Sequence, residues 1–162
     1  MNNIDESKNI EKNNIEKIID ESRNSYKIFD KIDILENEKI CYNSLIKKIN
    51  KRYFFYPSEI DKYKIDNYKK LITNIENGIN NIHEIIYETN CEIKKYWYID
   101  EVKEEGLNFI KRVEFKKLEL LRLIKDIKKK YIFYPSKEKR LKINKFKKII
   151  NYYNVYINHL LN

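Results

Sequence analysis

Two short stretches of this chain have nearly the same letters: KRYFFYPS at residues 51–58 and KKYIFYPS at residues 129–136. They contain the two prolines of a chain of 162 residues. Proline lacks an amide donor and disfavours the helical conformation in the residue before it. A serine that follows can satisfy free amides at the start of a new helix. Each stretch therefore predicts a corner between two helices, with Ser58 and Ser136 as N-caps.

The sequence around these corners is repeated as well. When the chain is shifted by 78 positions, residues 35–84 align with residues 113–162 without a gap, and 19 of the 50 pairs are identical. Compositional bias does not explain why both prolines and both serines align, so we interpret the match as an internal duplication. We expect two helical repeat units, residues 1–84 and 85–162, that pack as one domain.

Apolar residues in both copies recur at the spacing of three and four that is typical of helices. Two glycines and two prolines supply few turns for a β-sheet. We therefore expect an all-α fold, an internally duplicated helical bundle with about three helices per repeat, either compact or elongated. Gly106 is expected to end a helix, and Gly78 to mark a kink or a close helix crossing. Heptad-like seams follow the corners at Ile65, Tyr68, Ile72, Ile75, Ile79, Ile82 and Ile86, and at Ile143, Phe146, Ile150, Tyr153, Ile157 and Leu160.

Charge is distributed unevenly along the chain, whose formal net charge is +9. Residues 33–72 hold 9 basic and 6 acidic side chains, a net of +3, whereas the aligned residues 111–150 hold 16 and 4, a net of +12. Codon bias toward lysine would not separate charge in this way, so the second copy is a candidate electrostatic footprint. The alternatives are a solvated lysine face and an acidic protein partner. The candidate binding residues are Lys125, Lys128, Lys129, Lys130, Lys137, Lys139, Arg140, Lys142, Lys145, Lys147 and Lys148.

Aromatic residues at the two corners have two interpretations. Their rings could fold back and close the end of the bundle, where burial of one ring contributes roughly 1.5–3 kcal/mol. Exposed rings beside lysines would instead suit single-stranded nucleic acid, because bases stack on the rings while phosphates pair with the charges. The candidate stacking residues are Tyr53, Tyr56, Tyr131 and Tyr134.

The sequence offers little for catalysis. His83 and His159 lack partners at metal-ligand spacing, and Cys41 and Cys91 form no CxxC motif. Two scattered glycines exclude a glycine-rich phosphate loop. We therefore expect no metal, no cofactor, no small-molecule substrate and no enzymatic activity. An enzyme that uses His159 or Cys91, with a Cys–His nucleophile pair formed across the fold, is the least favoured option.

No apolar run approaches the roughly 18 residues that a membrane span requires, and the first 14 residues lack an apolar signal segment. Two isolated thiols suit a reducing compartment. We expect an intracellular, cytoplasmic protein without a membrane partner.

These observations predict a non-enzymatic helical binding protein that docks on nucleic acid or a nucleoprotein complex through its basic face. Such a protein would be an accessory ribonucleoprotein subunit or a mobile-element-type inhibitor. The alternative is a protein–protein interaction module or a homo-oligomer that pairs through the heptad-like seams.

Overall fold

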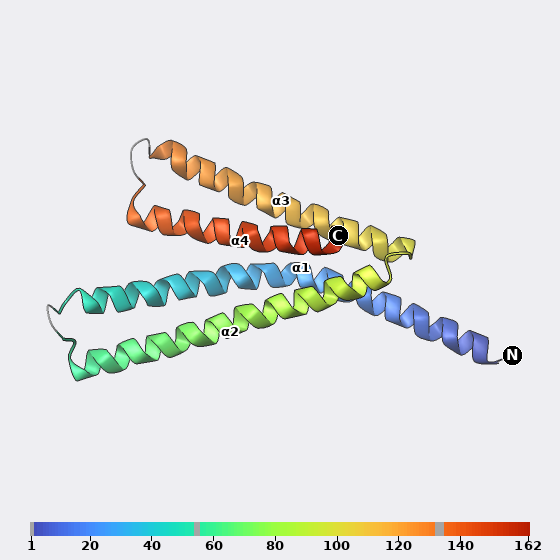
Figure 1. The fold of residues 1–162 in the computed structure, drawn as a ribbon, viewed down its shortest axis with the longest axis horizontal. Helices are drawn as coiled ribbons and strands as arrows, with labels where there is room; N and C mark the ends of the chain where they lie inside the picture. The colour runs from blue at the N-terminus through green and yellow to red at the C-terminus, as the bar shows by residue number, and fades with distance from the viewer. Residues whose placement is uncertain (1, 54–55, 132–134) are drawn as a thin grey trace. The chain divides into compact units, whose positions relative to one another are not determined.

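The protein is all-α, as expected. The computed structural model describes residues 2–53, 56–131 and 135–162, and their side chains except those of residues 2–10 and 26. Its helices are α1 (Asn2–Asn50), α2 (Glu59–Lys95), α3 (Asp100–Lys130) and α4 (Lys137–Leu161), and the described residues form no strand (Figure 1). None of these helices has the length and apolar character that crossing a membrane requires.

The chain forms four helices in its described part rather than the six that about three per repeat would give. The two helices expected before the first corner are one continuous α1, which contains neither proline nor glycine. In residues 85–162 the break comes between Lys95 and Asp100, and Gly106 lies inside α3 instead of ending a helix.

Close packing explains Gly106. A Cβ atom there would lie 2.4 Å from Cζ3 of Trp97 and 3.1 Å from Cγ2 of Ile93. The missing side chain therefore lets the indole of the α2–α3 turn lie against α3. Gly78 differs, because a Cβ atom there would meet Cδ1 of Leu35 at 3.7 Å, an ordinary contact distance. No close helix crossing requires that glycine.

Both corners start their second helix as predicted. The Ser58 hydroxyl accepts a hydrogen bond from the amide of Asp61 at 3.2 Å, and α2 begins at the next residue. The Ser136 hydroxyl accepts from the amide of Lys139 at 3.4 Å, with α4 beginning directly after it. The serine N-caps are therefore confirmed.

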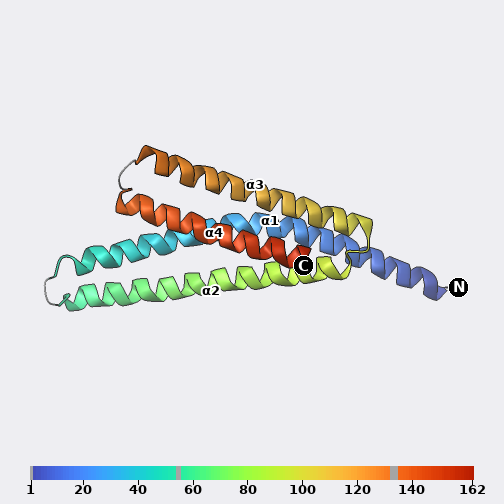
Figure 2. The same ribbon diagram turned by 45° about the horizontal axis from the view of Figure 1, so that its top comes forward.

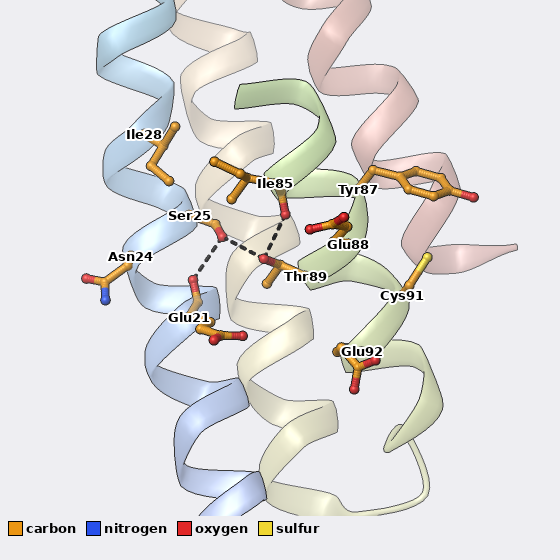
Figure 3. Close-up of a pocket in the computed structure, with 10 residues that line it drawn as sticks. All are labelled: Glu21, Asn24, Ser25, Ile28, Ile85, Tyr87, Glu88, Thr89, Cys91 and Glu92. Atoms are coloured by element: carbon orange, nitrogen blue, oxygen red, sulfur yellow. Dashed lines mark hydrogen bonds between the residues drawn. The ribbon is translucent and has the colours of Figure 1, made fainter. Parts of the chain in front are cut away.

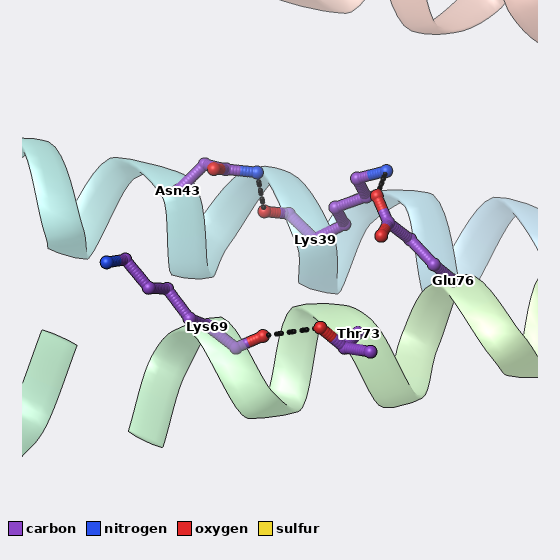
Figure 4. A network of polar contacts seen from close by, with 5 residues as sticks. All are labelled: Lys39, Asn43, Lys69, Thr73 and Glu76. Carbon is purple, nitrogen blue, oxygen red and sulfur yellow. Dashed lines mark hydrogen bonds and ion pairs between the residues drawn. The ribbon is translucent and has the colours of Figure 1, made fainter. Parts of the chain in front are cut away.

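The chain folds into two compact units. The hairpin unit, Asp30–His83, contains parts of α1 and α2 that run antiparallel on either side of the first corner (Figure 1). Stacked rings of Tyr42 and Tyr68, with centroids 5.6 Å apart, join its helices. An ion pair between Lys39 and Glu76 also joins them (Figure 4).

The four-helix unit, Met1–Phe29 with Glu84–Asn162, contains the remainder of α1 and α2 together with α3 and α4. The first 29 residues thus belong to the same compact unit as residues 84–162. Within this unit α3 and α4 lie side by side and antiparallel, joined at the second corner (Figure 2).

An aromatic cluster forms part of the core of the four-helix unit. The buried ring of Phe29 lies 5.7 Å from Phe109, 5.1 Å from Tyr153 and 5.4 Å from Tyr156, measured between centroids. These contacts hold α1, α3 and α4 together. Closer to the second corner, Ile124 of α3 packs with three residues of α4 in a further buried cluster: Ile143, Phe146 and Ile150.

The heptad-like seams are largely covered within the chain. All six seam residues of α4 are buried. In the first copy four of the seven seam residues are buried, namely Ile65, Ile75, Ile79 and Ile86, and the other three are half-buried.

Candidate nucleic-acid interface

The second corner brings the basic end of α3 to the basic start of α4. Residues 125–142 hold eight basic and two acidic side chains, a net of +6, on the two antiparallel helix ends and the corner between them. We name the eight basic residues the basic corner: Lys125, Lys128, Lys129, Lys130, Lys137, Lys139, Arg140 and Lys142.

The charges of the basic corner face solvent. Seven of its side chains are exposed, and Lys139 is half-exposed. None of its seven lysines forms an ion pair with a carboxylate among the described side chains. This surface therefore presents mostly uncompensated positive charge, which is what a polyanion requires.

The helix dipole explains only the charges at the end of α3. Lys128, Lys129 and Lys130 occupy the last turn of α3, where positive charge is favourable. Lys137 and Lys139 occupy the first turn of α4 on either side of Glu138, and at this end the dipole favours the carboxylate but opposes the two lysines. Helix stability thus gives no reason for the basic start of α4.

The first corner shows the opposite arrangement at the aligned positions. Glu59 and Asp61 lie in the first turn of α2, where the dipole favours them. Each has a cationic partner, since Lys62 lies 2.6 Å from Glu59 and Lys64 lies 3.5 Å from Asp61. The hydroxyl of Tyr53 also donates to Asp61 at 2.5 Å. This hydrogen bond and, to a smaller extent, the Lys64 charge hold the pKa of Asp61 below its ordinary value.

Tyr131 aligns with Tyr53, but it does not have the carboxylate partner that Tyr53 has. The residue aligned with Asp61 is Lys139, and the Tyr131 hydroxyl has no hydrogen-bond partner among the described residues. Its side chain is 37% exposed and follows directly after Lys130. A ring beside several lysines is the arrangement that base stacking uses.

The other candidate stacking residues are placed differently. Tyr56 is 82% exposed, while Tyr53 is half-buried with its hydroxyl bound to Asp61. Both belong to the hairpin unit and are not part of the basic corner. Tyr134 lies outside the described residues.

Three predicted lysines lie further along α4, and one of them is not on the surface. Lys145 is only 7% exposed, with its ammonium 5.1 Å from the centroid of the Phe146 ring. We therefore exclude Lys145 from the exposed basic face, because its aliphatic stem is packed and its charge lies over an aromatic ring. Lys147 is exposed, and Lys148 is half-buried with its ammonium 5.6 Å from the Tyr152 centroid.

The structure also contains a groove that the sequence did not indicate. It lies in the four-helix unit, has a volume of about 600 Å³ and is lined by residues of α1 and α2 (Figure 3). The Ser25 hydroxyl bonds to Thr89 at 3.4 Å and to the Glu21 carbonyl at 2.8 Å. These hydroxyls are thus occupied by the protein itself. Three carboxylates, of Glu21, Glu88 and Glu92, make the lining acidic.

No group of three or more potential metal ligands lies close together among the described residues. Comparisons of the chain with models of protein families, with curated proteins and with solved structures found no match.

Proposed function

We propose that this protein is a non-enzymatic, cytoplasmic binding protein that docks on nucleic acid, alone or within a nucleoprotein complex, through the basic corner. One observation carries the proposal: Lys137 and Lys139 stand at the start of α4 where the first copy has Glu59 and Asp61. Each lysine opposes the helix dipole at a cost of about 0.3–1 kcal/mol. A phosphate backbone would compensate for this cost, because it pairs with these charges and with the lysines that end α3.

Two further observations favour nucleic-acid binding over a solvated lysine face that serves only solubility. A genome biased toward lysine codons would enrich both corners alike, yet the first corner keeps its carboxylates and its internal ion pairs. The second corner also has a partly exposed ring, Tyr131, among its lysines. An accessory ribonucleoprotein subunit and a mobile-element-type inhibitor would both use such a surface.

We also propose that the two halves arose by duplication. The identical pairs in residues 35–84 and 113–162 support this proposal. So does the matching geometry of the two corners, each with a serine whose hydroxyl accepts from the amide three residues on. The two corners now differ in charge, because Glu59 and Asp61 of the first align with Lys137 and Lys139 of the second.

A protein-interaction module is the second candidate, and one observation favours it. The heptad-like seams are largely buried within the chain, but α3 exposes Leu107, Phe115, Leu118 and Leu121. At 100° per residue these four lie within about one third of the helix circumference. An apolar stripe of this kind is typical of a partner-binding face.

Binding of labelled single-stranded RNA, single-stranded DNA and duplex DNA, measured by fluorescence anisotropy at increasing salt, tests the proposal. Affinity should fall steeply with salt, because phosphate contacts release counterions. The double variant Lys129→Glu with Lys130→Glu should weaken binding at least about tenfold, since two phosphate contacts become repulsive.

A matched control separates the effect of this site on binding from the effect of the total charge of the protein. Lys51→Glu with Arg52→Glu makes the same change of charge at the aligned positions of the first corner, and it should weaken binding far less. Equal losses in both double variants, or no binding at low salt, would overturn the proposal. Retained binding of a protein partner by both variants would favour the interaction module.

A further inference from the structure

The fold brings a thiol and an imidazole together that lie 68 residues apart in the chain. Sγ of Cys91 on α2 is 3.9 Å from Nε2 of His159 in the last turn of α4. Both residues belong to the four-helix unit, and Cys91 is exposed to solvent. Figure 3 shows Cys91 and Tyr87 on the side of α2 that is turned toward α4, opposite Thr89. The thiol is thus accessible to a small reagent and has a potential base beside it.

The surroundings of His159 suit it to accept a proton. Its ring lies against Tyr87, with centroids 4.4 Å apart. Its Nδ1 atom is buried and has no hydrogen-bond partner among the described residues. The thiol of Cys91 is the group at Nε2, and in the tautomer that carries its proton on Nδ1 this nitrogen can accept the thiol proton. Burial, and then the nearby charge of Lys94, lower the pKa of His159, which favours the neutral imidazole, the form that can accept a proton.

We propose that Cys91 is a nucleophilic thiol, activated by His159 as its base, and that it forms reversible mixed disulfides with small disulfide molecules. The thiol proton passes to Nε2 of His159 while the sulfur attacks one sulfur of the disulfide. A new S–S bond to Cys91 replaces the one that breaks, and the leaving thiolate takes the proton from the imidazolium. The exchange needs no other oxidant. This site is independent of the basic corner and of nucleic-acid binding.

The chain contains an internal control. Cys41 on α1 is exposed as well, but its sulfur has no hydrogen-bond partner among the described residues. Two exposed thiols in one molecule, one beside an imidazole and one without a base, should differ in reactivity for that reason alone. A general base contributes substantial acceleration when it is well aligned. The contact of 3.9 Å is long for this role, so we expect about tenfold.

The test treats the full chain with oxidised glutathione at pH 7 and follows each cysteine by peptide mass spectrometry. Cys91 should gain glutathione about tenfold faster than Cys41. In His159→Gln the rate at Cys91 should fall to that of Cys41, whose own rate should not change. Urea should make the Cys91 and Cys41 rates equal in the wild-type chain. This comparison tests the effect of the fold even if His159→Gln folds poorly. Equal rates in the native chain, or an unchanged Cys91 rate in a folded His159→Gln variant, would overturn the proposal.

Discussion

The hydroxyl of Tyr53 donates a hydrogen bond of 2.5 Å to the Asp61 carboxylate, across the first corner of the chain. This contact ties the residues just after α1 to the first turn of α2. It is also the main reason that the pKa of Asp61 lies below its ordinary value of about 3.9. The contact therefore stabilises the folded chain more when Asp61 is ionised than when it is protonated.

Tyr53→Phe should lower the thermal unfolding midpoint at pH 7, because it removes the donor and keeps the ring. The folded-state pKa of Asp61 is depressed, so this stabilisation is present above the unfolded pKa and is lost as the pH falls through the folded one. The difference between wild type and variant should thus shrink as the pH is lowered from 7 toward about 2. Tyr131→Phe is the control and should change the midpoint at neither pH. A difference for Tyr53→Phe that does not depend on pH would contradict this assignment.

Gly106→Ala should destabilise the four-helix unit by about 1–3 kcal/mol, the usual cost of overpacking. The added methyl group would lie 2.4 Å from the Trp97 indole, which must then move. Gly78→Ala is the matched control, because its methyl group meets Leu35 at an ordinary distance. It should stabilise α2 by about 0.5–1 kcal/mol, since alanine is the better helix former. Urea unfolding measures whether the stability of each variant falls or rises. An equal change in stability for both variants would rule out the close contact at Gly106.

Phe29→Ala should lower the free energy of unfolding by about 3–5 kcal/mol. This ring is buried and contacts Phe109, Tyr153 and Tyr156, so its loss opens a cavity between three helices. Phe115→Ala removes the same ring from a position that is 64% exposed and should cost far less. Chemical denaturation measures both. Similar losses for the two variants would show that Phe115 is packed against something in solution.

The sequence predicted the helical class and both serine caps, because these depend on local features: apolar spacing, proline, and a serine directly after it. It did not predict how many helices form. Gly106 was interpreted as a helix end, since glycine is common there, but its role depends on Trp97, a tertiary contact that no local pattern shows. The same limit applies to burial. Lys145 is a lysine like the exposed Lys142 and Lys147 of the same helix, and only the packing of α4 reveals that it is covered.

For the candidate site, sequence predicted the position of the charge but not its organisation. The alignment of the two copies already pairs Glu59 with Lys137 and Asp61 with Lys139. The alignment could not show that Glu59 and Asp61 form ion pairs, whereas Lys137 and Lys139 form none among the described side chains. Both facts depend on side-chain geometry. The contact of Cys91 with His159 joins residues 68 positions apart, so the sequence could offer a pair of this kind only as its least favoured option.

The reversed first turn of α4 leads to a prediction with opposite signs in two measurements. Lys137→Glu with Lys139→Asp gives the second corner the carboxylates of the first. Folding stability should rise by about 0.3–1 kcal/mol for each change, because negative charge is favourable at a helix N-terminus. Binding of single-stranded nucleic acid should weaken, because four units of positive charge are lost from the surface that we propose as the interface.

A further substitution at Tyr131 separates the effect on stability from the effect on binding. A carboxylate at position 139 would offer the Tyr131 hydroxyl the partner that Tyr53 has in Asp61, and so hold the ring in place. Adding Tyr131→Phe to the double variant removes that new hydrogen bond, so part of the gain in stability should disappear while binding stays weak. Urea unfolding and anisotropy on the same preparations separate the two effects. If the lysines served only solubility, stability would rise with no loss of binding, because the start of α4 would then have no partner to lose.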